Sequence, residues 1–209
     1  MTQTAKVENI SVVIAELEQK CIELPDNYIA HHHLALVYRK AGRHQDAIRE
    51  FKRAIELDDN SGEAYVNLGG VYFEIGDLDQ ALAANKKALT FMIKPSQAHV
   101  NIGLIHQQRG EISQAIDAYT KAVAHDPNFA MGWVNLATAH VMAEDFSSAE
   151  RAARKACEID PSFGMAWNNL AVALYYKGDY QEAKSAMDQA VANHYPVDSR
   201  FIEAVRTAL

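Results

Sequence analysis

Residues 130–163 read AMGWVNLATAHVMAEDFSSAERAARKACEIDPSF, and residues 164–197 read GMAWNNLAVALYYKGDYQEAKSAMDQAVANHYPV. Aligned without a gap, both segments have tryptophan at position 4, Leu-Ala at positions 7 and 8, and alanine at positions 20 and 27. Alanine keeps this 34-residue spacing along the chain, in one series at Ala47, Ala81, Ala115, Ala149 and Ala183 and in another at Ala54, Ala88, Ala122, Ala156 and Ala190. A fixed period of this length indicates one structural unit that is copied along the chain.

Each copy contains two apolar stripes, at positions 4, 7, 8 and 11 and at positions 20, 24, 27 and 28, separated by a turn at positions 14–17. This i, i+3, i+4, i+7 spacing is typical of amphipathic helices, so each copy is predicted to be a helix-turn-helix. The small residues at positions 8 and 20 let the two helices approach closely. Position 15 of the turn is glycine in four copies and Glu144 in the fourth copy, which predicts either a different turn or a strained backbone there.

The pattern resembles the tetratricopeptide repeat family, whose signature includes a large residue at position 4, Leu-Gly or Leu-Ala at positions 7–8 and alanine at positions 20 and 27. Position 4 holds His31, Tyr65, His99, Trp133 and Trp167. The resemblance implies an all-α fold, a right-handed α-solenoid of five repeats at 28–61, 62–95, 96–129, 130–163 and 164–197. Apolar stripes predict a capping helix within residues 1–27, a decayed half-repeat, and another within 198–209.

The composition argues against several classes of function. A net charge of −7 is unsuited to a nucleic-acid surface, which needs clustered lysine and arginine. No apolar run is long enough for a membrane span, and the N-terminal residues lack the apolar region of a secretory signal. Cys21 and Cys157 fall at core positions of different helices, so we expect buried free thiols and a cytoplasmic location.

The chain contains no recognisable catalytic or cofactor motif. It has no phosphate-binding Gly-Lys-Ser/Thr loop, no His-Glu-x-x-His and no paired-cysteine zinc pattern. Of the nine histidines, no two lie three or four residues apart, and neighbours such as His31-His32-His33 diverge around a helix. We therefore expect no enzymatic activity, no cofactor and no metal site.

In the tetratricopeptide family the first helix of each repeat lines a concave groove, and position 6 faces that groove. Here position 6 holds Asn67, Asn101, Asn135 and Asn169 in repeats two to five. A carboxamide can bond both the N–H and the C=O of an extended peptide, and helices 8–10 Å apart would place one asparagine at about every third ligand residue. The alternative is that these asparagines bond neighbouring repeats.

Other groove positions become apolar toward the C-terminal end. The predicted contact residues there are Met131, Met142, Met165, Tyr175 and Tyr176, with Phe73 and Leu104 in earlier repeats. Methionine and tyrosine are adaptable, amphipathic contact residues. The competing interpretation is that the C-terminal helix folds back and covers this surface.

The sequence thus predicts a protein-interaction adaptor or assembly scaffold that binds an extended peptide of a partner protein. The alternative is a scaffold that forms homo-oligomers through the apolar junction 91–93 or the C-terminal helix. Phe91-Met92-Ile93 replaces a polar linker, so it either packs under the next repeat or forms a contact patch.

Overall fold

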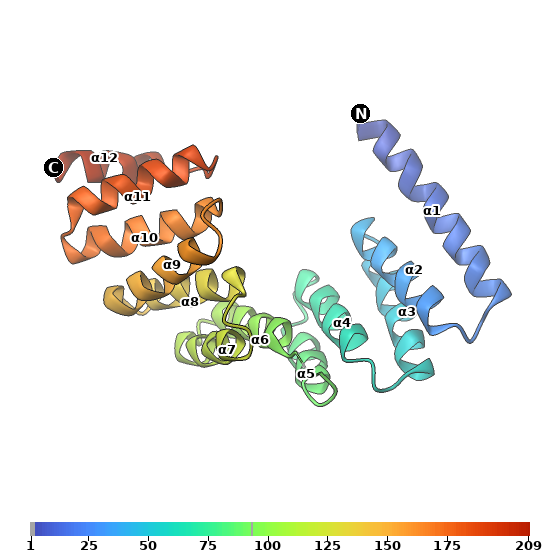
Figure 1. Cartoon of the computed structure of the whole chain (residues 1–209). Helices are drawn as coiled ribbons and strands as arrows, with labels where there is room; N and C mark the ends of the chain where they lie inside the picture. Colours follow the sequence, from blue (N-terminus) through green and yellow to red (C-terminus); the bar gives the residue numbers. More distant parts are fainter. Residues whose placement is uncertain (1–2, 93) are drawn as a thin grey trace. The chain divides into compact units, whose positions relative to one another are not determined.

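The computed structural model of the chain describes residues 3–92 and 94–209, and within these ranges it consists of α-helices and connecting turns with no β-strand (Figure 1). The chain divides into two compact units, residues 1–101 and 102–209, each of which is described by itself. Helix α6 begins in the first unit and ends in the second. The all-α class predicted from the repeat period is confirmed.

In the first unit, a long helix precedes two helical hairpins. Helix α1 packs against α2, while α2 with α3 and α4 with α5 form antiparallel pairs (Figure 1). The bounds are α1 Gln3–Glu23, α2 Tyr28–Lys40, α3 His44–Leu57, α4 Gly62–Glu74, α5 Leu78–Ala88 and α6 Ser96–Gln108.

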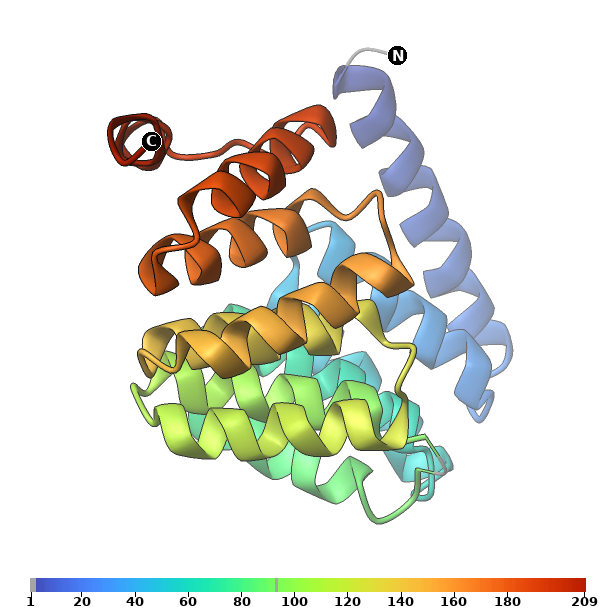
Figure 2. The same cartoon turned by 60° about the vertical axis from the view of Figure 1, so that its left-hand side comes forward.

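In the second unit, the hairpins α8–α9 and α10–α11 stack on each other, and the short α12 follows α11 (Figures 1 and 2). Helix α7 packs against α8. The bounds are α7 Ile112–His125, α8 Ala130–Met142, α9 Phe146–Ile159, α10 Gly164–Lys177, α11 Tyr180–Ala192 and α12 Ser199–Thr207.

All ten periodic alanines are fully buried, with no exposed surface. A larger side chain at such a position would force the packed helices apart. The 34-residue spacing of the alanines therefore reflects the close packing of the helices.

The turn inside each repeat is closed by the same backbone hydrogen bond. The N–H at position 16 donates to the carbonyl at position 11 at 2.9–3.0 Å, as in Asp179 to Leu174. Position 15 adopts the left-handed conformation, with φ of 88° at Gly178. Glu144 has φ of 58° and its turn closes with the same bond, so this repeat has the ordinary turn and a strained residue.

The apolar junction after α5 packs against its own unit. The ring of Phe91 stacks on Tyr65 with centroids 5.9 Å apart, and Met92 packs against a buried cluster that includes Val66 and Ala98. Ile93 lies outside the described residues. Phe91 and Met92 are half-buried, as the packing interpretation predicts.

Among the helices of the described ranges, none combines the length and the apolar composition that crossing a lipid bilayer requires.

Candidate binding surface

Three of the four position-6 asparagines form hydrogen bonds that join neighbouring repeats. Asn67 Nδ2 lies 3.2 Å from His32 Nε2. Burial lowers the pKa of His32, so its ring is neutral near pH 7 and can accept this bond. Asn169 Nδ2 donates to the Thr138 hydroxyl at 2.8 Å and to the Val134 carbonyl at 3.2 Å, which ties α10 to α8.

Asn101 bonds to a buried asparagine of the preceding repeat. Asn85 lies at position 24 of its repeat, where repeats one and three have Phe51 and Tyr119, and it is fully buried. Its Nδ2 donates to the Ala81 carbonyl at 2.8 Å, and its Oδ1 accepts from Asn101 Nδ2 at 3.0 Å. Gln97 donates to Asn101 Oδ1 at 2.9 Å, so both polar atoms of Asn101 are bonded within the chain. Gly69 leaves the space for Asn85, because a Cβ on Gly69 would lie 2.2 Å from Asn85 Nδ2.

Asn135 differs from the other three, because its side chain makes no hydrogen bond to any part of the chain that the structure describes. It is half-buried on α8. Met131, Asn135, Thr138 and Met142 follow one another at intervals of four, three and four residues, which places them on one face of α8. Met131 and Met142 are 40% and 49% exposed. The face therefore presents two exposed thioethers with an unpaired carboxamide between them.

The neighbouring helix α10 repeats this arrangement at the same repeat positions. Met165 and Asn169 are half-buried, and Tyr176 is 60% exposed. The ring of Tyr176 stacks on Phe146, the first residue of α9, with centroids 4.7 Å apart. This stacking fixes an exposed aromatic ring close to the end of α8, beyond Met142. We call the residues Met131, Asn135, Met142 and Tyr176 the apolar face of α8 and α10.

Helix α12 packs on Tyr175, whereas the ring of Tyr176 contacts Phe146 and Tyr175. Tyr175 packs edge-on against Phe201 of α12, with centroids 5.5 Å apart, and is half-buried. A hollow of about 520 Å³ beside Tyr175 is lined by Arg200, Glu203, Ala204, Thr207 and Ala208 of α12. The C-terminal helix thus covers Tyr175 and leaves Tyr176 exposed.

The two remaining predicted contact residues are less accessible. Phe73 on α4 and Leu104 on α6 are both half-buried. Near Phe73, Arg39 forms two hydrogen bonds to Glu74 Oε1, at 2.7 and 2.9 Å. The first unit therefore presents a charged surface on α2 and α4, and exposed apolar side chains of the predicted set lie in the second unit.

The repeat motifs and the helical hairpins agree with the comparisons to known proteins. A family model described as "Cilia and flagella-associated protein 70 C-terminal domain" matches residues 59–194, and one described as "TPR repeat" matches residues 35–76. No curated protein matches the chain.

Solved structures of similar fold cover most of the chain. MamA is 26% identical and has a TM-score of 0.67, with 75% of this chain and 92% of that chain covered. YrrB, described as a TPR protein with an unusual peptide-binding site, is 18% identical with a TM-score of 0.68, and the match covers 91% of this chain and 97% of that chain. PilW, a type IV pilus biogenesis factor, is 19% identical with a TM-score of 0.78, and the match covers 97% of this chain and 92% of that chain. Because the first family model matches more than half of the sequence, the chain belongs to the tetratricopeptide repeat family, in the group that this model describes.

Proposed function

We propose that this tetratricopeptide repeat protein binds an extended peptide segment of a partner protein, with the apolar face of α8 and α10 as its main contact. The observation that carries the proposal is Asn135, a half-buried amide without a partner in the described part of the chain, placed between exposed Met131 and Met142. Exposed apolar side chains beside one unpaired amide suit a ligand that has both apolar side chains and a peptide backbone.

The dimensions of this face set the size of the ligand contact. Met131 and Met142 are eleven residues apart on α8, which corresponds to about 16 Å along the helix axis. An extended peptide covers that distance with about five residues. Methionine repacks around different side chains, so the surface favours a class of apolar peptides over one fixed sequence.

The other asparagines contribute differently to the proposed interaction. Asn67, Asn101 and Asn169 use side-chain N–H groups to join repeats, so part of their hydrogen-bonding capacity is already used. Their main contribution in this proposal is to hold the first helices of adjacent repeats in register. Asn135 is the amide whose N–H and C=O are both available to a peptide backbone.

A peptide library of members on the order of ten residues tests the proposal. After selection on the wild-type chain, one enriched peptide is titrated against variants by calorimetry. Asn135→Ala should weaken binding about thirtyfold, since two neutral hydrogen bonds contribute roughly 1 kcal/mol each and about 1.4 kcal/mol corresponds to tenfold. Tyr176→Ala should weaken it as well.

The matched control is Val191→Ala on α11, because Val191 is 50% exposed but lies on the second helix of its repeat, outside the face. Its affinity should equal that of the wild type. If Asn135→Ala and Tyr176→Ala bind the selected peptide as tightly as Val191→Ala does, the face is not the binding site.

The second candidate function is self-association through α12. The observation that favours it is the hollow of about 520 Å³ between Tyr175 and α12, which an apolar side chain of a second copy could fill. Light scattering over a dilution series distinguishes the two functions. An oligomer that dissociates when residues 198–209 are deleted supports self-association, and a monomer at all concentrations excludes it.

We also propose that the chain has no catalytic role and acts in the cytoplasm. Both cysteines are free, which suits a reducing compartment. Measuring the compartment with an antibody against the untagged protein in fractionated host cells tests the location.

A further inference from the structure

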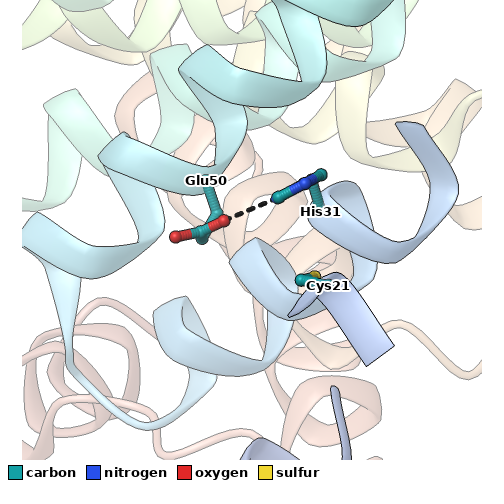
Figure 3. A group of neighbouring side chains, drawn as sticks. All are labelled: Cys21, His31 and Glu50. Carbon is teal, nitrogen blue, oxygen red and sulfur yellow. Dashed lines mark hydrogen bonds and ion pairs between the residues drawn. The ribbon is translucent and has the colours of Figure 1, made fainter. Parts of the chain in front are cut away.

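Three potential metal ligands from three different helices meet in the first unit. Cys21 of α1, His31 of α2 and Glu50 of α3 point toward one another (Figure 3). One ligand atom from each lies within 4.8 Å of the other two. His31 and Glu50 are buried, while Cys21 is half-buried, so the prediction of a buried thiol is wrong for Cys21.

The hydrogen bonds of His31 place a proton on one ring nitrogen. Its Nε2 lies 3.1 Å from the Pro25 carbonyl, which can only accept, so Nε2 carries hydrogen. Its Nδ1 lies 2.8 Å from Glu50 Oε2. A neutral imidazole with hydrogen on Nε2 would direct its Nδ1 lone pair at a carboxylate oxygen, which is repulsive. A hydrogen on Nδ1 or on Oε2 relieves this repulsion at 2.8 Å. A metal ion bound by both atoms would relieve it in the same way, with the two atoms about 3.5 Å apart.

The hydrogen-bond partners of His31 and Glu50 orient these side chains in the way that outer-shell partners orient metal ligands. A histidine ligand commonly donates its other N–H to a backbone carbonyl, as His31 does to Pro25. Arg49 Nε donates to Glu50 Oε1 at 2.9 Å, which leaves Oε2 directed at His31. Both the ring and the carboxylate are thus oriented before any ion binds.

The same three residue types could suggest a cysteine nucleophile with a histidine base, but the geometry does not support that role. Nε2 of His31 is bonded to Pro25, and Nδ1 faces Glu50, so neither nitrogen is free to take the thiol proton. Burial and the Glu50 carboxylate raise the pKa of Cys21, whereas an activated thiol has a lowered pKa.

We propose that Cys21, His31 and Glu50 form a divalent transition-metal site, with Zn²⁺ as the preferred ion, which fastens α1 to the α2–α3 hairpin. Thiolate, imidazole and carboxylate are all zinc ligands, and three protein ligands leave a fourth position for water. A thiolate and a carboxylate together balance the charge of a divalent ion, which a largely buried position requires. The three ligand atoms lie within 4.8 Å of one another, and tetrahedral ligands lie about 3.5 Å apart, so binding requires small shifts. Nδ1 of His31 and Oε2 of Glu50, now 2.8 Å apart, would move apart by about 0.7 Å.

The site lies in the first unit and does not depend on the proposed peptide binding. Its ligands come from three helices, so the ion would link the N-terminal helix to the first hairpin where the solenoid needs a cap. Metal supply would then control how firmly α1 covers the first repeat.

Cobalt titration of the full, untagged chain tests the site directly. Co²⁺ bound to a thiolate gives a sulfur-to-metal charge-transfer band that oxygen and nitrogen ligands do not give. We expect this band to saturate at one equivalent in the wild type and in Cys157→Ser, which removes the other cysteine. It should be absent in Cys21→Ser, whose fold is checked by circular dichroism.

Zinc affinity, measured by competition with a chromophoric chelator, gives a second readout. Loss of an outer-shell partner alone costs 10–100-fold, so Cys21→Ser and Glu50→Gln should each weaken zinc binding by more than about tenfold. His33→Gln, beside His31 but outside the cluster, should bind as the wild type does. A wild type without the thiolate band, or a Cys21→Ser variant with wild-type zinc affinity, would show that His31 and Glu50 share only a proton.

Discussion

A substitution at Gly103 measures how tightly the repeat helices are packed. Gly103 occupies position 8 on α6, opposite Tyr119 of α7. A Cβ there would lie 2.4, 2.6 and 2.8 Å from three ring carbons of Tyr119, where ordinary contacts are 3.4–4 Å. The ring would have to move by about 1 Å, although Tyr119 is fully buried and its hydroxyl donates to Gln107 at 3.1 Å.

The magnitude follows from two opposing contributions to the free energy of unfolding. Alanine is favoured over glycine within a helix by about 1 kcal/mol. Overpacking a well-filled core costs about 1–3 kcal/mol, and a buried ring held by a hydrogen bond belongs at the upper end. We therefore expect Gly103→Ala to destabilise the chain by about 1–2 kcal/mol.

Gly70→Ala on α4 is the control. A Cβ on Gly70 would meet the guanidinium end of Arg39 at 2.9–3.1 Å, and this flexible, partly exposed side chain can shift. The gain in helix propensity should then exceed the cost of moving Arg39, and Gly70→Ala should raise the free energy of unfolding by about 0.5–1 kcal/mol.

Urea unfolding followed by far-UV circular dichroism compares the two variants. The expected difference of about 1.5–3 kcal/mol separates their midpoints by roughly 1 M for an m-value of about 2 kcal/mol/M. If Gly103→Ala proves as stable as Gly70→Ala with an unchanged m-value, the conclusion that small residues at position 8 permit helix contact is wrong.

Two further predictions concern the second unit. Glu144→Gly should raise the melting temperature by a few degrees, corresponding to about 0.5–1 kcal/mol, because glycine adopts the positive φ of this turn without strain. A lower melting temperature would mean that Glu144 makes a compensating contact. Burial lowers the pKa of His140 below its usual value of 6.5, so the unfolded chain binds a proton more readily than the folded chain. The contribution of His140 to folding stability is therefore fully present above pH 6.5 and is lost as the pH falls through and below that value. Urea midpoints at about pH 7 and about pH 5.5 should therefore differ less in His140→Gln than in the wild type, and equal differences would contradict this assignment.

The sequence predicted the fold well because its strongest signal comes from helix contact. The periodic alanines are fixed by close packing, and the structure buries all of them. The left-handed turn at Glu144 was one of two alternatives, which only the backbone geometry could separate.

The candidate site was less predictable because hydrogen-bond partners depend on side-chain geometry. The repeat pattern identified the four asparagines at position 6. It could not show that Asn101 bonds to Asn85, or that the Asn135 side chain has no hydrogen bond in the described part of the chain. Whether the C-terminal helix covers Tyr175 or Tyr176 depends on the path of the chain after α11.

The cluster of Cys21, His31 and Glu50 could not be found from spacing within one helix. Its members are ten and nineteen residues apart and lie on three helices. The rule that two ligands lie three or four residues apart applies to a single helix and misses such an arrangement.

The paired amides of Asn85 and Asn101 have a consequence for the order of the repeats. In a chain built from interchangeable units, any repeat could follow any other, yet here the second repeat carries a buried amide whose oxygen is bonded by the third. A shuffled chain in which another repeat followed the second would need its own position-6 asparagine to reach Asn85, or it would leave a buried acceptor without a donor. This pair thus restricts which unit can follow the second repeat: repeats four and five also have asparagine at position 6, whereas the first repeat has His33 there. A design that places the first repeat after the second would have to replace His33 with asparagine or remove Asn85.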